Sequence, residues 1–208
     1  MSQPAPASAD ASPWIVLKFG GTSVSKRSRW DTIGALAQQR RDQGLRVLLV
    51  VSAVSGVTNA LQAMIDAHAD PDACAAAVAA LDAKHRAFAR ELGLDPEAEI
   101  GDLLASLARL ATDARREEGA LDWQAELLSH GELLSSRLGA AYLRSRGLAI
   151  GWSDARSHLR AIALPNQNAW SRRLSVSCDA RPDVEWRTRY AAQGELLITQ
   201  GFIACDAD

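Results

Sequence analysis

Two short apolar runs near the N-terminus flank a segment with helical spacing. The runs are Trp14–Phe19 (WIVLKF), which ends at a Gly-Gly pair, and Arg46–Ser52 (RVLLVVS), which is rich in β-branched residues. Both are typical of buried strands. Between them, apolar residues recur every three to four positions from about Arg29 to Gln43, and Gly44 supplies a C-terminal stop. Strand, helix and strand in this order predict a right-handed crossover, a parallel sheet and the α/β fold class.

The middle of the chain predicts helices, and its last third predicts two more strands. Alanine-rich segments separated by proline and glycine predict helices over Val57–Ala69, Asp72–Leu92, Glu97–Glu118 and Asp122–Arg146. Further apolar runs predict strands at Leu148–Trp152 and Leu196–Ile203, with a short helix between them at Glu185–Gln193. The last strand is followed by no capping element, so we expect the chain to end within its domain.

The amino-acid composition of the chain excludes several kinds of binding partner. The 208 residues carry 23 Lys+Arg and 25 Asp+Glu, so no excess of positive charge is available for nucleic acid. Residues 1–12 are small, polar and proline-bearing, which predicts a disordered tail and neither a leader nor a membrane anchor. The three cysteines and four histidines lack the spacing of a zinc site or disulfide framework. We therefore expect a cytoplasmic protein without a membrane partner, and we assign no metal ligand.

The end of the first strand is the best candidate for phosphate chemistry. Lys18 places a cation there, and Gly20 and Gly21 let the backbone approach a ligand at the turn into a helix. A lysine in this place can neutralise charge on a transferring phosphoryl group. The spacing matches neither the Walker A pattern nor the dinucleotide fingerprint. These residues also allow an alternative to phosphate binding, in which Gly20 and Gly21 form only a tight turn beside a solvated lysine.

Four motifs carry a resemblance to a known family. They occur in the order KFGGTSV (18–24), VVSAVSGVTNAL (50–61), SHGELLSSRL (129–138) and LLITQGFIA (196–204). Together they resemble the aspartokinases of the amino-acid kinase superfamily. The resemblance implies a carbamate kinase-like fold, a three-layer sandwich with a mainly parallel central sheet. Residues 13–208 would be the N-terminal part of that domain, incomplete at its C-terminus.

The resemblance also implies roles for particular residues. Lys18 would contact ATP phosphate and assist its transfer, within a phosphate-binding set made of Lys18, Gly20, Gly21, Thr22 and Ser23. The aspartate pocket would be lined by Ser52, Thr58, Glu132 and Phe202. In this pocket the Glu132 carboxylate would pair with the α-ammonium group of aspartate.

Each pocket residue also has an ordinary structural interpretation. Ser52 and Thr58, at the entrance of a helix, could be caps. Glu132 could be a solvated helical charge, and Phe202 could be a core side chain. For Asp154 and Arg156, which also fit the family pattern, we expect a structural ion pair.

The implied function is ATP-dependent phosphorylation of the L-aspartate side-chain carboxylate to 4-phospho-L-aspartate, the first step towards lysine, threonine and methionine. The implied cofactor is ATP with Mg²⁺, and the full-length enzyme would be a homo-oligomer, in some organisms fused to a second enzyme. Aspartokinases continue into an Arg-Gly-Gly-Ser-Asp segment that this sequence lacks, so we expect these 208 residues alone to be inactive. Two alternatives remain: another carboxylate kinase of the superfamily, and a non-catalytic chain serving as a binding or assembly module.

Overall fold

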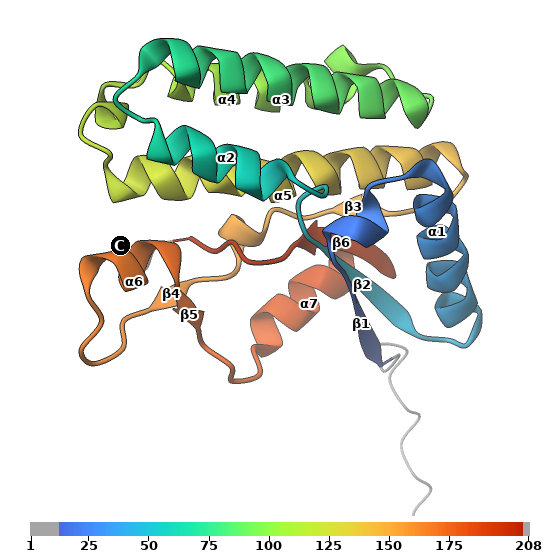
Figure 1. The fold of residues 1–208 in the computed structure, drawn as a ribbon. Helices are drawn as coiled ribbons and strands as arrows, with labels where there is room; N and C mark the ends of the chain where they lie inside the picture. Colours follow the sequence, from blue (N-terminus) through green and yellow to red (C-terminus); the bar gives the residue numbers. More distant parts are fainter. Residues whose placement is uncertain (1–12, 206–208) are drawn as a thin grey trace, which may run out of the picture.

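The computed structural model describes residues 13–205, so the tail expected at 1–12 lies outside the described residues. Its centre is a parallel sheet with the strand order β1-β2-β6-β3 (Figure 1). The strands are β1 (Trp14–Phe19), β2 (Arg46–Val51), β6 (Leu196–Gln200) and β3 (Gly151–Trp152). Phe19 pairs with Val51, and Val51 with Gln200, so β1, β2 and β6 end side by side. The predicted α/β class with a parallel sheet is confirmed.

One face of the sheet is covered by α1 (Arg27–Asp42) and α5 (Leu121–Ser145). Alternate residues of β2 on this face, Val47, Leu49 and Val51, are completely buried, as expected for a strand with one covered face. The two helices meet where Trp30 packs on Gly139. A Cβ at Gly139 would lie 2.0 Å from the Trp30 ring, so only glycine permits this approach.

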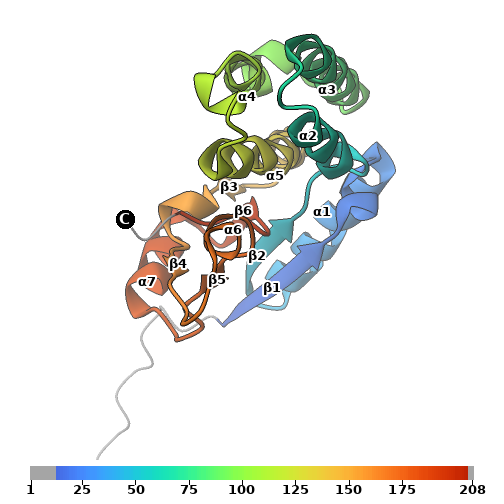
Figure 2. The same cartoon turned by 60° about the vertical axis from the view of Figure 1, so that its left-hand side comes forward.

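A second helical layer extends away from the sheet. It is formed by α2 (Val57–Asp66), α3 (Pro71–Glu91) and α4 (Pro96–Leu110), which pack with α5 as an antiparallel group (Figure 2). Asp70 and Asp95 cap α3 and α4, and each precedes a proline at the first helical position. None of the helices in residues 13–205 is long and apolar enough to cross a membrane.

The segment between β3 and β6 lies beside the sheet and includes α7 (Val184–Gln193), which was predicted. Its other short elements are η3 (Ala155–Ser157), β4 (Ala161–Ile162), α6 (Ala169–Leu174) and β5 (Ser177–Cys178). Aromatic contacts hold α7: Tyr190 lies 5.0 Å from the His158 ring and 6.1 Å from the Trp14 ring, measured between ring centres. Neither α6 nor the antiparallel β4-β5 pair was predicted, because both are shorter than any periodic pattern can reveal.

Three predicted boundaries were wrong. The helix expected at Glu97–Glu118 ends at Leu110, whose carbonyl oxygen accepts a hydrogen bond from the Trp123 indole at 2.9 Å; the turn η2 (Ala114–Arg116) follows. The strand expected at Leu148–Trp152 pairs only over Gly151–Trp152. The strand expected to reach Ile203 ends at Gln200, because Phe202 adopts a left-handed conformation (φ 64°) that leaves the sheet.

Candidate functional site

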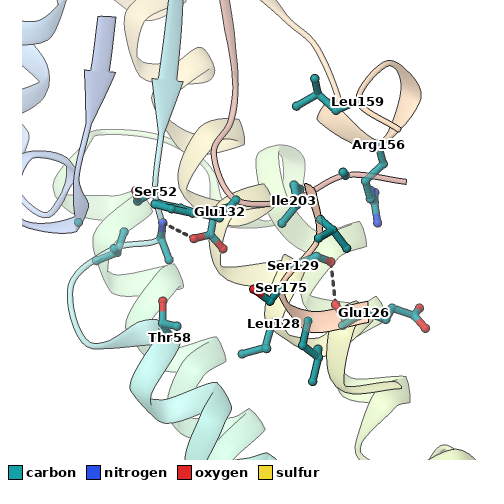
Figure 3. A pocket seen from close by; sticks show the side chains of 18 of the residues that line it. Ser52, Thr58, Glu126, Leu128, Ser129, Glu132, Arg156, Leu159, Ser175 and Ile203 are labelled. Atoms are coloured by element: carbon teal, nitrogen blue, oxygen red, sulfur yellow. Dashed lines mark hydrogen bonds between the residues drawn. The ribbon is translucent and has the colours of Figure 1, made fainter. Parts of the chain in front are cut away.

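A cleft of about 1010 Å³ opens where β1, β2 and β6 end (Figure 3). This is the edge at which parallel α/β sheets bind ligands, since the loops that follow neighbouring strands converge there. Six residues predicted from the sequence line the cleft: Gly21, Thr22, Ser52, Thr58, Glu132 and Phe202. The other three, Lys18, Gly20 and Ser23, are not among its lining residues.

Glu132 is the buried acidic group of the cleft. It lies in the middle of α5 and is only 8% exposed, so the solvated-charge interpretation is wrong. Its Oε1 accepts a hydrogen bond from the Ala53 backbone N–H at 3.2 Å, drawn as a dashed line in Figure 3. Burial raises the pKa of the carboxyl group, and the hydrogen bond from Ala53 opposes this only in part. A carboxylate with so few partners can bind a cation that enters the cleft.

The loop from Ser52 to Thr58 forms a second wall. The Ser52 N–H donates to the Phe19 carbonyl at 3.1 Å, which continues the pairing of β1 and β2 into the cleft. The N-cap of α2 is Gly56 with φ 80°, so the interpretation of Ser52 and Thr58 as caps is wrong. Thr58 is exposed in the first turn of α2, and its side chain is therefore available to a ligand.

The Gly20-Gly21 turn leads into η1 (Gly21–Val24), and α1 begins only at Arg27. A Cβ at Gly21 would lie 2.8 Å from the Ala53 carbonyl oxygen, whereas a Cβ at Gly20 would meet nothing within 4 Å. Gly21 therefore brings the first loop against the second, and Gly20 leaves open space beside the exposed Lys18.

The hydroxyl of Ser25, which was not predicted as a site residue, joins the same two loops. The Ser25 Oγ donates to the Gly21 carbonyl and accepts from the Ser55 N–H at 2.9 Å. Lys84 on α3 donates to the Ser55 carbonyl at 2.8 Å, which ties the loop to the outer helical layer. The only local signal was the position of Ser25 directly after the first motif.

Phe202 is not a core side chain. It is 79% exposed, lines the cleft, and its ring centre lies 4.9 Å from the Lys18 Nζ. This distance is within the range of a cation–π contact. The contact places the lysine ammonium beside the mouth of the cleft, even though Lys18 does not line it. A left-handed backbone at a bulky residue costs about 1–3 kcal/mol and is found mainly at functional sites.

The profile of the amino acid kinase family matches residues 13–208. The chain belongs to the amino acid kinase family. It is 33% identical to bifunctional aspartokinase/homoserine dehydrogenase 1 of Arabidopsis thaliana, in an alignment covering 92% of this chain and 21% of the relative. It is 28% identical to lysine-sensitive aspartokinase 3 of Escherichia coli, in an alignment covering 92% of this chain and 41% of that one.

A solved amino acid kinase has a similar fold. The crystal structure of E. coli aspartokinase III in complex with aspartate and ADP superimposes with a TM-score of 0.68 and 28% identity, over 94% of this chain and 42% of that one. The resemblance to aspartokinases inferred from the four motifs is thus confirmed. The chain spans between about a fifth and two fifths of the length of these relatives.

The cleft of this amino acid kinase is also lined by Arg156, a cation for which no binding role was predicted. It forms the expected ion pair with Asp154, through Nη2–Oδ2 at 2.7 Å and Nε–Oδ1 at 3.0 Å. Burial acts to raise the pKa of Asp154, but the hydrogen bonds from Arg156 outweigh it and the pKa is lowered. The pair therefore stays ionised at neutral pH, and Arg156 lines the cleft as a fixed positive charge.

Residues 13–205 contain no group of three or more His, Cys, Asp and Glu side chains arranged to hold a metal ion. They do contain room for phosphate, because the space beside Gly20 is open and the exposed Lys18 is close to it. The α2 N-terminus also faces the cleft at Gly56 and Thr58, and a helix N-terminus favours anions. The residues present thus fit the phosphate groups of a nucleotide.

Proposed function

We propose that the chain forms the amino acid-binding and phosphate-facing part of an ATP-dependent aspartate kinase, which produces 4-phospho-L-aspartate. The observation that supports this most is Glu132, a buried carboxylate at the strand ends in a cleft whose mouth carries Lys18 and Phe202. The aspartate and ADP in the structure of E. coli aspartokinase III support the choice of substrates.

In this mechanism the α-ammonium group of aspartate binds Glu132, and Ser52 and Thr58 contact the rest of the amino acid. A side-chain carboxylate oxygen then attacks the γ-phosphorus of ATP, the bond from that phosphorus to the β–γ bridging oxygen breaks, and its electron pair leaves on ADP. Lys18 stabilises charge on the transferring group, while Gly20, Gly21, Thr22 and Ser23 face the phosphates. Mg²⁺ bound with ATP would neutralise phosphate charge. The chain's own contribution is positioning.

The proposed function also implies a cellular location, an oligomeric state and a metabolic role for the complete protein. The complete protein would be a cytoplasmic homo-oligomer that catalyses the first step of lysine, threonine and methionine biosynthesis. The nearly balanced charge, with 23 basic and 25 acidic residues, supports small-molecule substrates in preference to nucleic acid.

The test is acyl phosphate formation by the complete protein, trapped as the hydroxamate with hydroxylamine, beside its Lys18→Ala variant. We expect product from L-aspartate with ATP, and a kcat lowered about 100-fold or more in Lys18→Ala, as for loss of a group that stabilises transition-state charge. Lys26→Ala is the control, since Lys26 is an exposed lysine just before α1 and outside the cleft lining. Preference for glutamate or N-acetylglutamate would indicate another carboxylate kinase, and absence of any acyl phosphate would favour the non-catalytic alternative.

A further inference from the structure

Gln200 is the last residue of β6 and one of the most buried polar side chains in the described part of the chain, with 1% exposure. It pairs with Val51, the last residue of β2, so it lies at the strand ends next to the cleft without lining it. A buried amide is costly unless both its ends are hydrogen bonded. The hydrogen-bond partners of the Gln200 amide therefore show which segments of the chain it connects.

Both ends of the amide have short hydrogen bonds. Gln200 Oε1 accepts from the Ala155 N–H at 2.7 Å, and Gln200 Nε2 donates to the Ser136 Oγ at 2.7 Å. Because a backbone N–H can only donate, these contacts also determine the orientation of the amide. The Ser136 hydroxyl accepts a second hydrogen bond from the Trp152 indole at 3.0 Å and donates to the Leu133 carbonyl at 3.1 Å. Its capacity of two accepted bonds and one donated bond is full.

Three walls of the cleft meet at this amide. Ser136 lies one helical turn beyond Glu132 on α5, so it shares the face that carries the buried carboxylate. Ala155 directly precedes Arg156 in η3. Gln200 itself is two residues before Phe202, whose left-handed backbone starts the next wall. The segments are far apart in sequence: Ser136 and Gln200 are separated by 64 positions, and Ala155 and Gln200 by 45.

We propose that Gln200 is a positioning residue for the amino acid site, because its side-chain amide sets the place of Glu132, Arg156 and Phe202 relative to one another. This inference rests on the proposed function. Gln200 does not touch the substrate. It acts on α5 through Ser136 and on the Arg156 turn through Ala155, and without it α5 can shift along the end of β6. Glu132 would then lose its hydrogen bond to the Ala53 N–H, which lies in the loop that follows β2.

The first readout needs no ligand. In Gln200→Met, which keeps the size of the side chain and removes both hydrogen bonds, we expect the amide protons of Ala53 and Ala155 to exchange about ten-fold faster, as for loss of a buried hydrogen bond. The Ser52 amide, bonded to Phe19 within the strand pairing, is the internal reference and should not change. Ser136→Ala should accelerate the exchange of the Ala53 amide proton but not that of the Ala155 amide proton. It also provides a second variant if Gln200→Met does not fold.

The second readout is steady-state kinetics of the complete protein. We expect Gln200→Met to raise the KM for L-aspartate about ten-fold and to change the KM for ATP less than about two-fold, because the amide holds the amino acid side of the cleft. The matched control is Gln62→Met, which removes an exposed amide bonded to Asp66 at 2.9 Å on the same helix. It should leave both KM values and all three amides unchanged.

The outcomes separate this inference from the proposed function. An unchanged Ala53 amide in both Gln200→Met and Ser136→Ala would overturn it, as would equal effects on both KM values. If the wild-type protein does not use L-aspartate, the proposed function fails, and the exchange of the Ala53 and Ala155 amides then decides by itself whether Gln200 sets the geometry of the cleft.

Discussion

The carboxylate of Glu132 and the backbone N–H of Ala53 form a hydrogen bond of 3.2 Å across 79 positions of sequence. This contact joins α5 to the loop that follows β2, and so it joins the second and third motifs of the chain. Gly131 makes the approach possible, since a Cβ there would lie 2.8 Å from the Ala53 side chain. The packing of α5 against the loop after β2 therefore depends on two adjacent residues: Glu132, which accepts the hydrogen bond, and Gly131, which has no side chain to prevent the close approach.

The raised pKa of Glu132 predicts a pH-dependent effect on stability. The folded protein binds this proton more tightly than the unfolded chain does. The stability from Glu132 is therefore fully present below the ordinary carboxyl pKa of 4.5 and is lost as the pH rises through the folded pKa. We expect Glu132→Gln, which has no charge to bury, to become progressively more stable than wild type as the pH rises through this range. Urea unfolding at a series of pH values measures the difference, and parallel curves would contradict the prediction.

The two glycines of the first motif should respond differently to alanine. Gly21→Ala pushes a Cβ against the Ala53 carbonyl at 2.8 Å, and we expect a loss of about 1–3 kcal/mol in the free energy of unfolding. Gly20→Ala meets open space at an ordinary φ of −79° and should change stability by less than about 1 kcal/mol. Denaturant melts of the pair provide the comparison. Equal destabilisation would show that Gly21 does not form this close approach.

The Ser25 hydroxyl should stabilise the two loops at the mouth of the cleft. Ser25→Ala removes the bonds to the Gly21 carbonyl and the Ser55 N–H, and we expect a loss of about 1–2 kcal/mol in the free energy of unfolding. The matched control is Ser28→Ala, an exposed serine in the first turn of α1, where the change should stay within about 0.5 kcal/mol. Thermal melts of both variants test this, and a Ser25→Ala variant as stable as the control would exclude the bridge.

Phe202 should affect binding without affecting stability. Its side chain is 79% exposed, so Phe202→Ala removes little buried surface and should alter the free energy of unfolding by less than about 1 kcal/mol. Loss of the ring also removes the contact that holds the Lys18 ammonium near the cleft. On the proposed function, we expect a KM for L-aspartate at least about five-fold higher. A large loss of stability in Phe202→Ala with unchanged kinetics would show that Phe202 is a structural residue and not a binding residue.

Much of the fold was accessible from local patterns. The strands at Trp14–Phe19 and Arg46–Val51 and the helix between them follow from apolar spacing over six to sixteen residues, which is enough to specify an element and its buried face. The Gly and Pro boundaries of α2, α3 and α5 were also predicted within a few residues. The two-residue strands β4 and β5 contain too little periodicity to be recognised, and β3 was predicted with its start three residues too early.

The sequence by itself determined the family, the parallel α/β class and the segments that carry candidate chemistry, because motifs and periodicity are properties of neighbouring residues. Only the tertiary structure decided that Glu132 is buried, that Phe202 is exposed, and that Gln200 joins α5 to the Arg156 turn. Burial and hydrogen bonding depend on which distant segments the folded chain brings together. A glutamate on a helix has the same local pattern whether it faces water or the Ala53 amide, and only packing distinguishes the two.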